Sequence, residues 1–261
     1  MPSYNLVGAL SRGLAVLRAV SLQKTATVGS IHKEIGLDKA TIVRMLETLE
    51  REGYIIHAVG EETYEITGRT LLLSQGFDKL THIGRLANPL LTELRNQIGW
   101  PSHVGVRDGE AMVTVQATNE LGSLTFNRPL GYRAPMLETS IGLAYLAFCQ
   151  EAERTAIVLK LRENGRLWKA SEHDGQTLGE RITEIRARRF AMMETSYSNS
   201  QYRGLVWAIA VPILDKERLY GCINLVMLRN AVSIAAVKKS LLKPLEETAS
   251  RLAAIFQKDW R

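Results

Sequence analysis

The stretch TVGSIHKEIGLDKATIVRMLETLEREG, residues 27–53, decides the fold of the N-terminal part of this chain. Thr27 is a good N-cap for a short helix, VGSIHKEI, and Gly36 interrupts that helix. Asp38 can cap a second helix, which begins at Lys39 and ends at Gly53. The apolar residues of the second helix recur at helical spacing, and they predict its buried face: Ile42, Met45, Leu46 and Leu49.

The segments on either side extend this pattern. Upstream, residues 9–22 (ALSRGLAVLRAVSL) place Leu10, Leu14, Leu17 and Val20 or Ala19 at the spacing of another helix. Downstream, residues 54–59 and 63–67 read as two strands of a short hairpin. Three helices followed by a hairpin are the order of a winged helix-turn-helix, whose third helix enters the DNA major groove. We therefore predict a winged helix-turn-helix DNA-binding domain over residues 1–69.

The outward face of the third helix supplies candidate DNA contacts. It offers a cation for phosphate or guanine, a hydroxyl, small groups for a thymine methyl, and an arginine that can pair with guanine. The residues concerned are Lys39, Ala40, Thr41, Val43 and Arg44. Arg12 and Thr27 are candidates for phosphate contacts, Thr27 because it stands at a helix N-terminus. A solvated helical hairpin with ordinary surface charges is the alternative for the same pattern.

Net charge gives this prediction little support. The chain carries a net charge of +6, which favours a polyanionic partner. Residues 1–80, however, hold nine basic and nine acidic residues, so the whole excess lies beyond residue 80. DNA binding is therefore inferred from the local arrangement of residues and not from bulk charge.

The rest of the sequence predicts a second, larger domain. Residues 70–98 read as a helical linker that can break near Gly84 and at Asn88-Pro89. From Trp100 onward the apolar pattern alternates as in strands, and Asp108-Gly109 is a strong hairpin turn signal. Strands are expected at 103–118, 123–128, 205–214 and 219–228, and helices at 140–149, 151–163, 176–192 and 233–256. We predict an α+β fold with a GAF-like antiparallel sheet flanked by helices over residues 99–261.

Several classes of protein are not favoured by the composition. No apolar run approaches the roughly 20 residues that span a bilayer, and no signal-peptide pattern is present, so we expect a cytoplasmic protein without a membrane partner. Cys149 and Cys222 form neither a disulfide framework nor a zinc set, and we expect no metal and no cofactor. His103, Asp108 and Cys222 offer a weak enzyme alternative, a Cys/His site, without a nucleophile elbow or a phosphate loop. We therefore predict that the chain is not an enzyme.

Five stretches together resemble the IclR family of bacterial transcriptional regulators over nearly the whole chain. They are LSRGLAVLRAV, the helix-turn-helix stretch above, GRTLLLSQGF, GYRAPMLETSIGLAYLAFC and GLVWAIAVPILDKERLYGCINLV. Within the family, WPSHVGV, LTFNRP and LAFC resemble the activators of aromatic-acid, that is 3-(3-hydroxyphenyl)propionate, catabolism. The resemblance implies a homodimer or dimer of dimers on a palindromic double-stranded operator, with RNA polymerase as a candidate protein partner. It also implies an effector domain with a pocket for a small organic acid.

One part of that pocket is also suggested by the residues alone. Glu138-Thr139-Ser140 opens an apolar helix, and free backbone N–H groups and hydroxyls at a helix N-terminus favour an anion. The alternative is a simple N-cap at Thr139 or Ser140. The resemblance implies that the effector lies against this helix start and two late strands. The effector-binding residues expected from it are Ser140, Ile141, Ser198, Val206, Ala208, Asn224 and Val226, with Met136 and Leu137 in the loop that walls the pocket.

The same resemblance bears on the kind of acid. Family members that sense two- and three-carbon acids carry two serines where this chain has Asn224 and Val226, and Gly-Ala where it has Ser140-Ile141. One wall of the effector pocket is therefore expected to be less polar than in those family members, which implies an aromatic or longer acid. Arg128 is a candidate partner for the carboxylate, and an ordinary surface arginine is the alternative.

The resulting prediction is a DNA-binding regulator that senses a small aromatic carboxylic acid and controls a catabolic operon. A DNA-binding protein controlled only by protein partners is a further alternative. It is less favoured because a C-terminal domain of about 160 residues exceeds what dimerisation alone requires.

Overall fold

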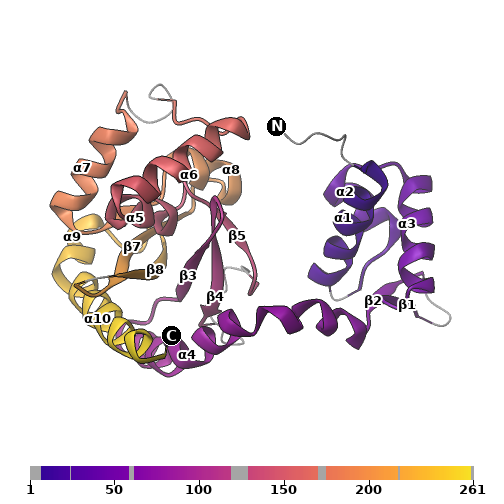
Figure 1. The fold of residues 1–261 in the computed structure, drawn as a ribbon, viewed down its shortest axis with the longest axis horizontal. Helices are drawn as coiled ribbons and strands as arrows, with labels where there is room; N and C mark the ends of the chain where they lie inside the picture. The colour runs from indigo at the N-terminus through magenta and orange to yellow at the C-terminus, as the bar shows by residue number, and fades with distance from the viewer. Residues whose placement is uncertain are drawn as a thin grey trace. The chain divides into compact units, whose positions relative to one another are not determined.

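The computed structural model describes residues 7–23, 25–58, 62–118, 129–169, 175–216 and 218–259. The chain divides into two compact units, Met1–Asp78 and Lys79–Arg261. Residues 70–98, predicted as one linker, are shared between these units. Each unit has its own hydrophobic core, and each is described by itself below (Figure 1).

The first unit has the predicted order of three helices and a hairpin. Its elements are α1 (Gly8–Leu22), α2 (Val28–Ile35), α3 (Lys39–Arg51), β1 (Ile55–His57), β2 (Tyr64–Ile66) and the 3-10 helix η1 (Gly68–Phe77). β1 pairs with β2 in antiparallel register, with Ile56 opposite Glu65. The hairpin connection at residues 59–61 lies outside the described residues.

Local side-chain chemistry sets the ends of α2 and α3. Thr27 and Ser30 form a reciprocal capping box at the start of α2, and Gly36 ends that helix in a left-handed conformation with φ of 70°. Asp38 caps α3 by accepting a hydrogen bond from the Thr41 amide at 2.8 Å. The hydrogen bonds from Thr41 hold the pKa of the Asp38 carboxyl below its usual value.

The core of the first unit uses the predicted face of α3 and the C-terminal half of the predicted face of α1, where Leu17 packs against it. Ile42 and Leu46 are fully buried, with Met45 and Leu49 packed against them. On α1 the buried residues are Val16, Ala19 and Val20. Leu10 and Leu14, part of the apolar pattern that predicted α1, are exposed in this unit.

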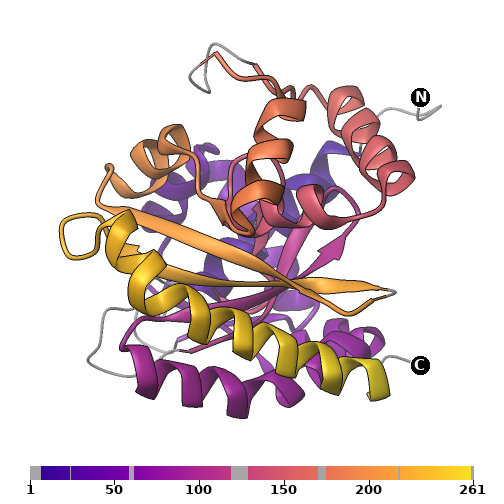
Figure 2. The same cartoon turned by 90° about the vertical axis from the view of Figure 1, so that its left-hand side faces the viewer.

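The second unit is built on a six-stranded antiparallel sheet in the order β5-β4-β3-β8-β7-β6. The strands are β3 (Ser102–Asp108), β4 (Ala111–Ala117), β5 (Arg133–Pro135), β6 (Ala191–Met192), β7 (Val206–Leu214) and β8 (Leu219–Leu228). Figure 2 shows the sheet between two helical layers. One layer is α4 (Asp78–Ile98) and α10 (Leu242–Asp259), and the other contains α5 (Ser140–Phe148), α6 (Glu151–Glu163), α7 (Leu178–Arg188) and α8 (Thr195–Tyr202).

Several predicted boundaries in the second unit are wrong. The linker helix does not break at Gly84 or Asn88-Pro89, because α4 continues through both, and residues 68–77 form η1 instead. The helix expected over 176–192 ends at Arg188, and β6 follows. Neither β5 nor α8 was among the expected elements. The helix predicted from 233 comprises α9 (Ile234–Ala236), the π-helical turn η3 (Val237–Leu241) and α10. The strand expected at 123–128 lies outside the described residues.

Gly84 explains how α4 lies so close to the sheet. A Cβ atom at this position would stand 2.3 Å from the carbonyl oxygen of Val115 on β4. On the same face, Ile83, Ala87 and Leu91 are buried in the core of the second unit. The helix predicted as a connector is therefore a structural part of the sheet domain from residue 79 onward.

We predict that Gly84→Ala destabilises the second unit, since the added methyl group must push α4 away from β4. The free energy of unfolding should fall by about 1–3 kcal/mol, as for other overpacked sites. Gly179→Ala on α7 is the matched control, because its Cβ would meet only Thr177 Oγ1 at 4.0 Å. Urea denaturation of both variants measures the difference, and equal stability would contradict this account of Gly84.

Candidate functional site

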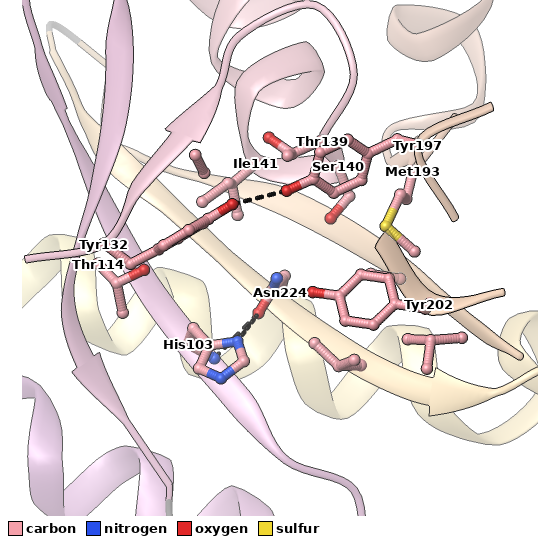
Figure 3. Close-up of a pocket in the computed structure, with 14 residues that line it drawn as sticks. His103, Thr114, Tyr132, Thr139, Ser140, Ile141, Met193, Tyr197, Tyr202 and Asn224 are labelled. Atoms are coloured by element: carbon pink, nitrogen blue, oxygen red, sulfur yellow. Dashed lines mark hydrogen bonds between the residues drawn. The ribbon is translucent and has the colours of Figure 1, made fainter. Parts of the chain in front are cut away.

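A narrow pocket, called the inner pocket here, lies in the second unit between the sheet, the start of α5, and α8 (Figure 3). Its volume is about 40 Å³. The polar side chains in its lining are His103, Thr114, Tyr132, Thr139, Ser140, Tyr197, Tyr202 and Asn224. The apolar lining residues are Ala134, Ile141, Met193, Val206, Ala208 and Val226. None of these described lining residues is Lys, Arg, Asp or Glu.

One end of the inner pocket is the N-terminus of α5. Thr139 is the N-cap, and its Oγ1 accepts from the Gly142 amide at 3.2 Å and donates to the Pro135 carbonyl at 2.7 Å. The simple capping role considered for this position therefore holds for Thr139. The backbone amides of Ser140 and Ile141, and the Ser140 hydroxyl, donate to no acceptor among the described residues. This end can accept an anion, because unused N–H groups and the positive end of the helix dipole meet there.

The other end is formed by Asn224 on β8 and His103 on β3, which face each other in the strand register. The Asn224 Oδ1 accepts from the His103 backbone N–H at 3.0 Å and lies 3.2 Å from His103 Nδ1. Because a backbone N–H can only donate, this contact fixes which amide atom faces β3. The amide nitrogen of Asn224 is left on the pocket side, where it donates to no described acceptor (Figure 3).

Three tyrosines complete the lining. The hydroxyls of Tyr132 and Tyr197 lie 2.7 Å apart and form a hydrogen bond across one side of the inner pocket (Figure 3). Tyr202 comes from the C-terminal end of the same helix, α8, as Tyr197. The inner pocket thus joins two polar ends through aromatic and apolar walls, an arrangement suited to a small, flat molecule with a polar group at each end.

The predicted effector residues divide between this pocket and other places. Ser140, Ile141, Val206, Ala208, Asn224 and Val226 line it. Ser198 does not, because it is buried in α8 and its hydroxyl donates to the Val206 carbonyl. Met136 and Leu137 line a neighbouring cavity instead. Arg128 lies outside the described residues.

Sequence reasoning missed most of the tyrosine wall. Tyr197, Tyr202 and Met193 lie in α8 or just before it, and the sequence did not predict this helix because TSYSNSQY has no apolar period. His103 was considered only as a member of an enzyme site. The alternation of β3 and β8 was the available signal, since it places His103 beside Asn224 once the two strands are paired.

The alternative Cys/His site receives no support from the geometry. Cys222 is fully buried opposite Gly105, and burial raises the pKa of its thiol well above the usual value. Burial also raises the pKa of Cys149 to about 11, so neither sulfur is a ready nucleophile. Among the described residues no group of three metal-ligating side chains occurs. No described helix is long and apolar enough to cross a membrane.

A second candidate site is the face of α3 opposite its buried stripe. Lys39, Ala40 and Arg44 are exposed there, and Thr41 and Val43 are half-buried. Neither Lys39 nor Arg44 forms an ion pair within the described part of the chain. Two further predicted DNA contacts already have local partners, since Thr27 is engaged in the capping box and Arg12 Nε donates to the Gly8 carbonyl at 3.1 Å.

The comparisons with known proteins match both units. Residues 9–56 match the model of the IclR helix-turn-helix domain, and residues 78–254 match that of the bacterial transcriptional regulator IclR C-terminal domain. The chain is 26% identical to the HTH-type transcriptional regulator XynR of Escherichia coli (strain K12) over 88% of its length and 90% of the relative's. It is 21% identical to the regulator KdgR of the same organism over 80% of this chain and 78% of that relative.

Solved structures show the same fold. An IclR family transcriptional regulator from Brucella abortus aligns with a TM-score of 0.60 and 25% identity, over 96% of this chain and 93% of that one. An IclR homolog from Microbacterium hydrocarbonoxydans, solved in complex with 4-hydroxybenzoate, aligns with a TM-score of 0.66 and 14% identity over 96% of this chain and 99% of its own. With both domain models matched in order over most of the sequence, the chain belongs to the IclR family of bacterial transcriptional regulators.

Proposed function

We propose that this regulator binds a small aromatic carboxylic acid in the inner pocket and changes its operator binding or promoter activation in response. The observation that carries the proposal is the pair of unused donor groups at opposite ends of the inner pocket, at the start of α5 and at Asn224. A catabolic operon for such an acid is the target that fits this sensor.

The carboxylate fits best at the start of α5. There the amides of Ser140 and Ile141 and the Ser140 hydroxyl can each donate to it, and the helix dipole favours negative charge. Because no described lining residue is Lys or Arg, neutral hydrogen-bond donors would hold the carboxylate. The apolar side chains around the aromatic ring would then be those of Ile141, Val206 and Ala208.

The far end of the acid would meet Asn224. Its amide nitrogen faces the pocket while its oxygen is held by the His103 backbone, so it offers a hydrogen-bond donor. A ring hydroxyl is a suitable acceptor for that donor, which favours a hydroxylated aromatic acid. The crystallised family member that holds 4-hydroxybenzoate supports this class of ligand for the fold.

Binding such a molecule requires the walls to move. The inner pocket measures about 40 Å³, whereas ligand pockets usually start near roughly 300 Å³. Displacement of lining side chains during binding gives the ligand a means of favouring one conformation of the domain over another.

DNA recognition is assigned to α3 in the same proposal. Lys39, Ala40, Thr41, Val43 and Arg44 would meet the major groove, while Arg12 and the start of α2 at Thr27 would meet phosphates. A homodimer or dimer of dimers would place two such helices on a palindromic operator, and RNA polymerase is the candidate partner for activation.

We predict that Arg44→Ala weakens binding to an operator selected from random DNA with the unaltered protein. The loss should be about 1–3 kcal/mol if Arg44 pairs with a guanine, and it should be concentrated on that base pair. Arg51→Ala, two turns further along α3, is the matched control and should change affinity much less. Fluorescence anisotropy on wild-type and base-substituted operators measures both, and an unchanged affinity of the Arg44 variant would remove it from the recognition surface.

We also predict that Asn224→Leu removes discrimination between 4-hydroxybenzoate and benzoate. Loss of one hydrogen bond of about 1 kcal/mol should weaken 4-hydroxybenzoate binding roughly fivefold, with a smaller effect on benzoate. Isothermal titration calorimetry of both acids gives the ratio of affinities. If the variant keeps the wild-type ratio, Asn224 does not contact the ring hydroxyl.

A further inference from the structure

A second cavity of about 400 Å³, called the outer cavity here, lies beside the inner pocket. Its polar lining includes Arg166, Lys169, Glu138 and the hydroxyl groups of Ser196 and Ser200. It is much larger than the inner pocket, and it differs in chemistry because its lining carries full charges. Among the described lining residues the charged side chains are Arg166, Lys169 and Glu138.

Arg166 is the group best placed to attract an anion into the outer cavity. Its backbone is fixed just after α6, where Gly165 turns the chain with φ of 72° and the Arg166 amide donates to the Leu161 carbonyl at 2.8 Å. Its guanidinium forms no ion pair with any described acidic residue. An exposed arginine that has no ion-pair partner among the described residues, and that lines the same cavity as Ser196, is suited to receive the carboxylate of a ligand.

Tyr197 separates the two cavities. Among the described residues it is the side chain that lines both of them. It is 5% exposed, and its hydroxyl is held by the Tyr132 hydroxyl at 2.7 Å. For a ligand to pass from the outer cavity to the inner pocket at Tyr197, this side chain must turn away and its hydrogen bond with Tyr132 must break.

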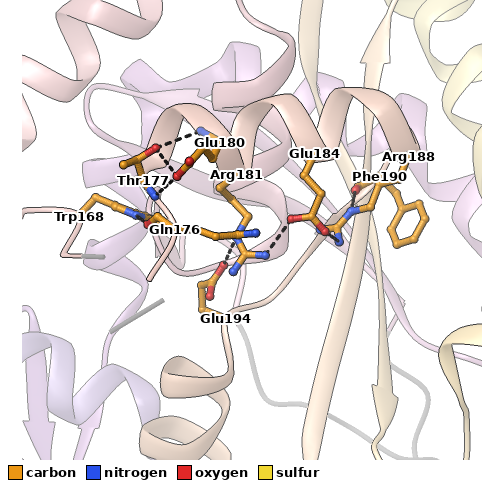
Figure 4. A network of polar contacts seen from close by, with 9 residues as sticks. All are labelled: Trp168, Gln176, Thr177, Glu180, Arg181, Glu184, Arg188, Phe190 and Glu194. Carbon is orange, nitrogen blue, oxygen red and sulfur yellow. Dashed lines mark hydrogen bonds and ion pairs between the residues drawn. The ribbon is translucent and has the colours of Figure 1, made fainter. Parts of the chain in front are cut away.

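The helix that carries Tyr197 is itself well anchored. Glu194, which precedes α8, lies 3.3 Å from Arg181 of α7 through their Oε1 and Nε atoms (Figure 4). The Glu194 amide also donates to the Glu138 carbonyl at 2.9 Å, next to the start of α5. Glu194 is therefore held on two sides, by Arg181 of α7 and by the chain before α5, which fixes the start of α8.

We propose that the outer cavity is an entry chamber for the acid, in which Arg166 binds the carboxylate first, and that Tyr197 is the gate to the inner pocket, held closed by Tyr132. This inference rests on the proposed function, because it takes the inner pocket as the final binding site of the acid. The chamber itself is a separate binding site for aromatic carboxylates.

The chamber is tested by NMR titration of the full chain with benzoate and with its uncharged counterpart benzamide. Benzoate should shift the amide resonances of Ser196 and Ser200, and benzamide should shift them much less. Arg166→Gln should weaken these shifts about threefold or more, as expected when the nearest cation is removed from a focusing cleft. Arg162→Gln is the matched control, an exposed cation on α6 that does not line the outer cavity, and it should change nothing.

The same titration separates this inference from the proposed function. Shifts at Ser196 and Ser200 without shifts at Ala208 would refute benzoate binding in the inner pocket and leave the chamber standing. Shifts at Ala208 without shifts at Ser196 and Ser200, or equal shifts in the Arg166 and Arg162 variants, would overturn the chamber.

The gate is tested with Tyr197→Phe and Tyr132→Phe, which remove the same hydrogen bond from opposite sides. Both should speed benzoate exchange at Ala208 by a similar factor, and the double variant should be no faster than either single one, because the bond is lost only once. Tyr132 does not line the outer cavity. Equal exchange rates in the two variants would therefore be due to the lost hydrogen bond and not to a changed wall of that cavity. Unchanged exchange in both variants, or no entry of benzoate into the inner pocket in any of them, would overturn the gate.

Discussion

The contact on which the pocket depends most is the one between Gly142 and the chain at Met136. A Cβ atom at Gly142 would lie 2.4 Å from the Met136 carbonyl oxygen, so glycine is required for α5 to begin so close to the preceding loop. Thr139 reinforces the contact by bonding forward to Gly142 and backward to Pro135. This short segment turns Ser140 and Ile141 toward the inner pocket and Met136 and Leu137 toward the outer cavity.

Much of the first unit could be predicted because its signals are local. Thr27, Gly36 and Asp38 act within one helical turn of their own positions, so residue type alone identifies the ends of α2 and α3. The apolar spacing at Ile42 and Leu46 correctly indicated which face of α3 is buried. The exposed Leu10 and Leu14 show the limit of this reasoning, since helical spacing says that residues share a face but not that another element covers it.

The pocket was only partly predictable because it is assembled from distant segments. Asn224 and Ser140 were suggested by family resemblance, and both line the inner pocket. Tyr197 and Tyr202 were missed since α8, with the sequence TSYSNSQY, has no apolar period to mark it as a helix. Met136 and Leu137 were expected in the same wall as Ser140, but the tight turn before α5 places them on its other side. Tertiary contacts of this kind leave no periodic trace in the sequence.

A regulator of the proposed kind requires that occupancy of the inner pocket and operator binding are linked. Linkage requires that the acid and the operator change each other's affinity by the same factor, typically about 5–150-fold. The most direct measurement is the affinity of the protein for 4-hydroxybenzoate, determined by calorimetry with the free protein and with its operator complex. We expect two different affinities, with a ratio that equals the change in operator affinity caused by saturating 4-hydroxybenzoate. Identical affinities in the free and the operator-bound protein would contradict it.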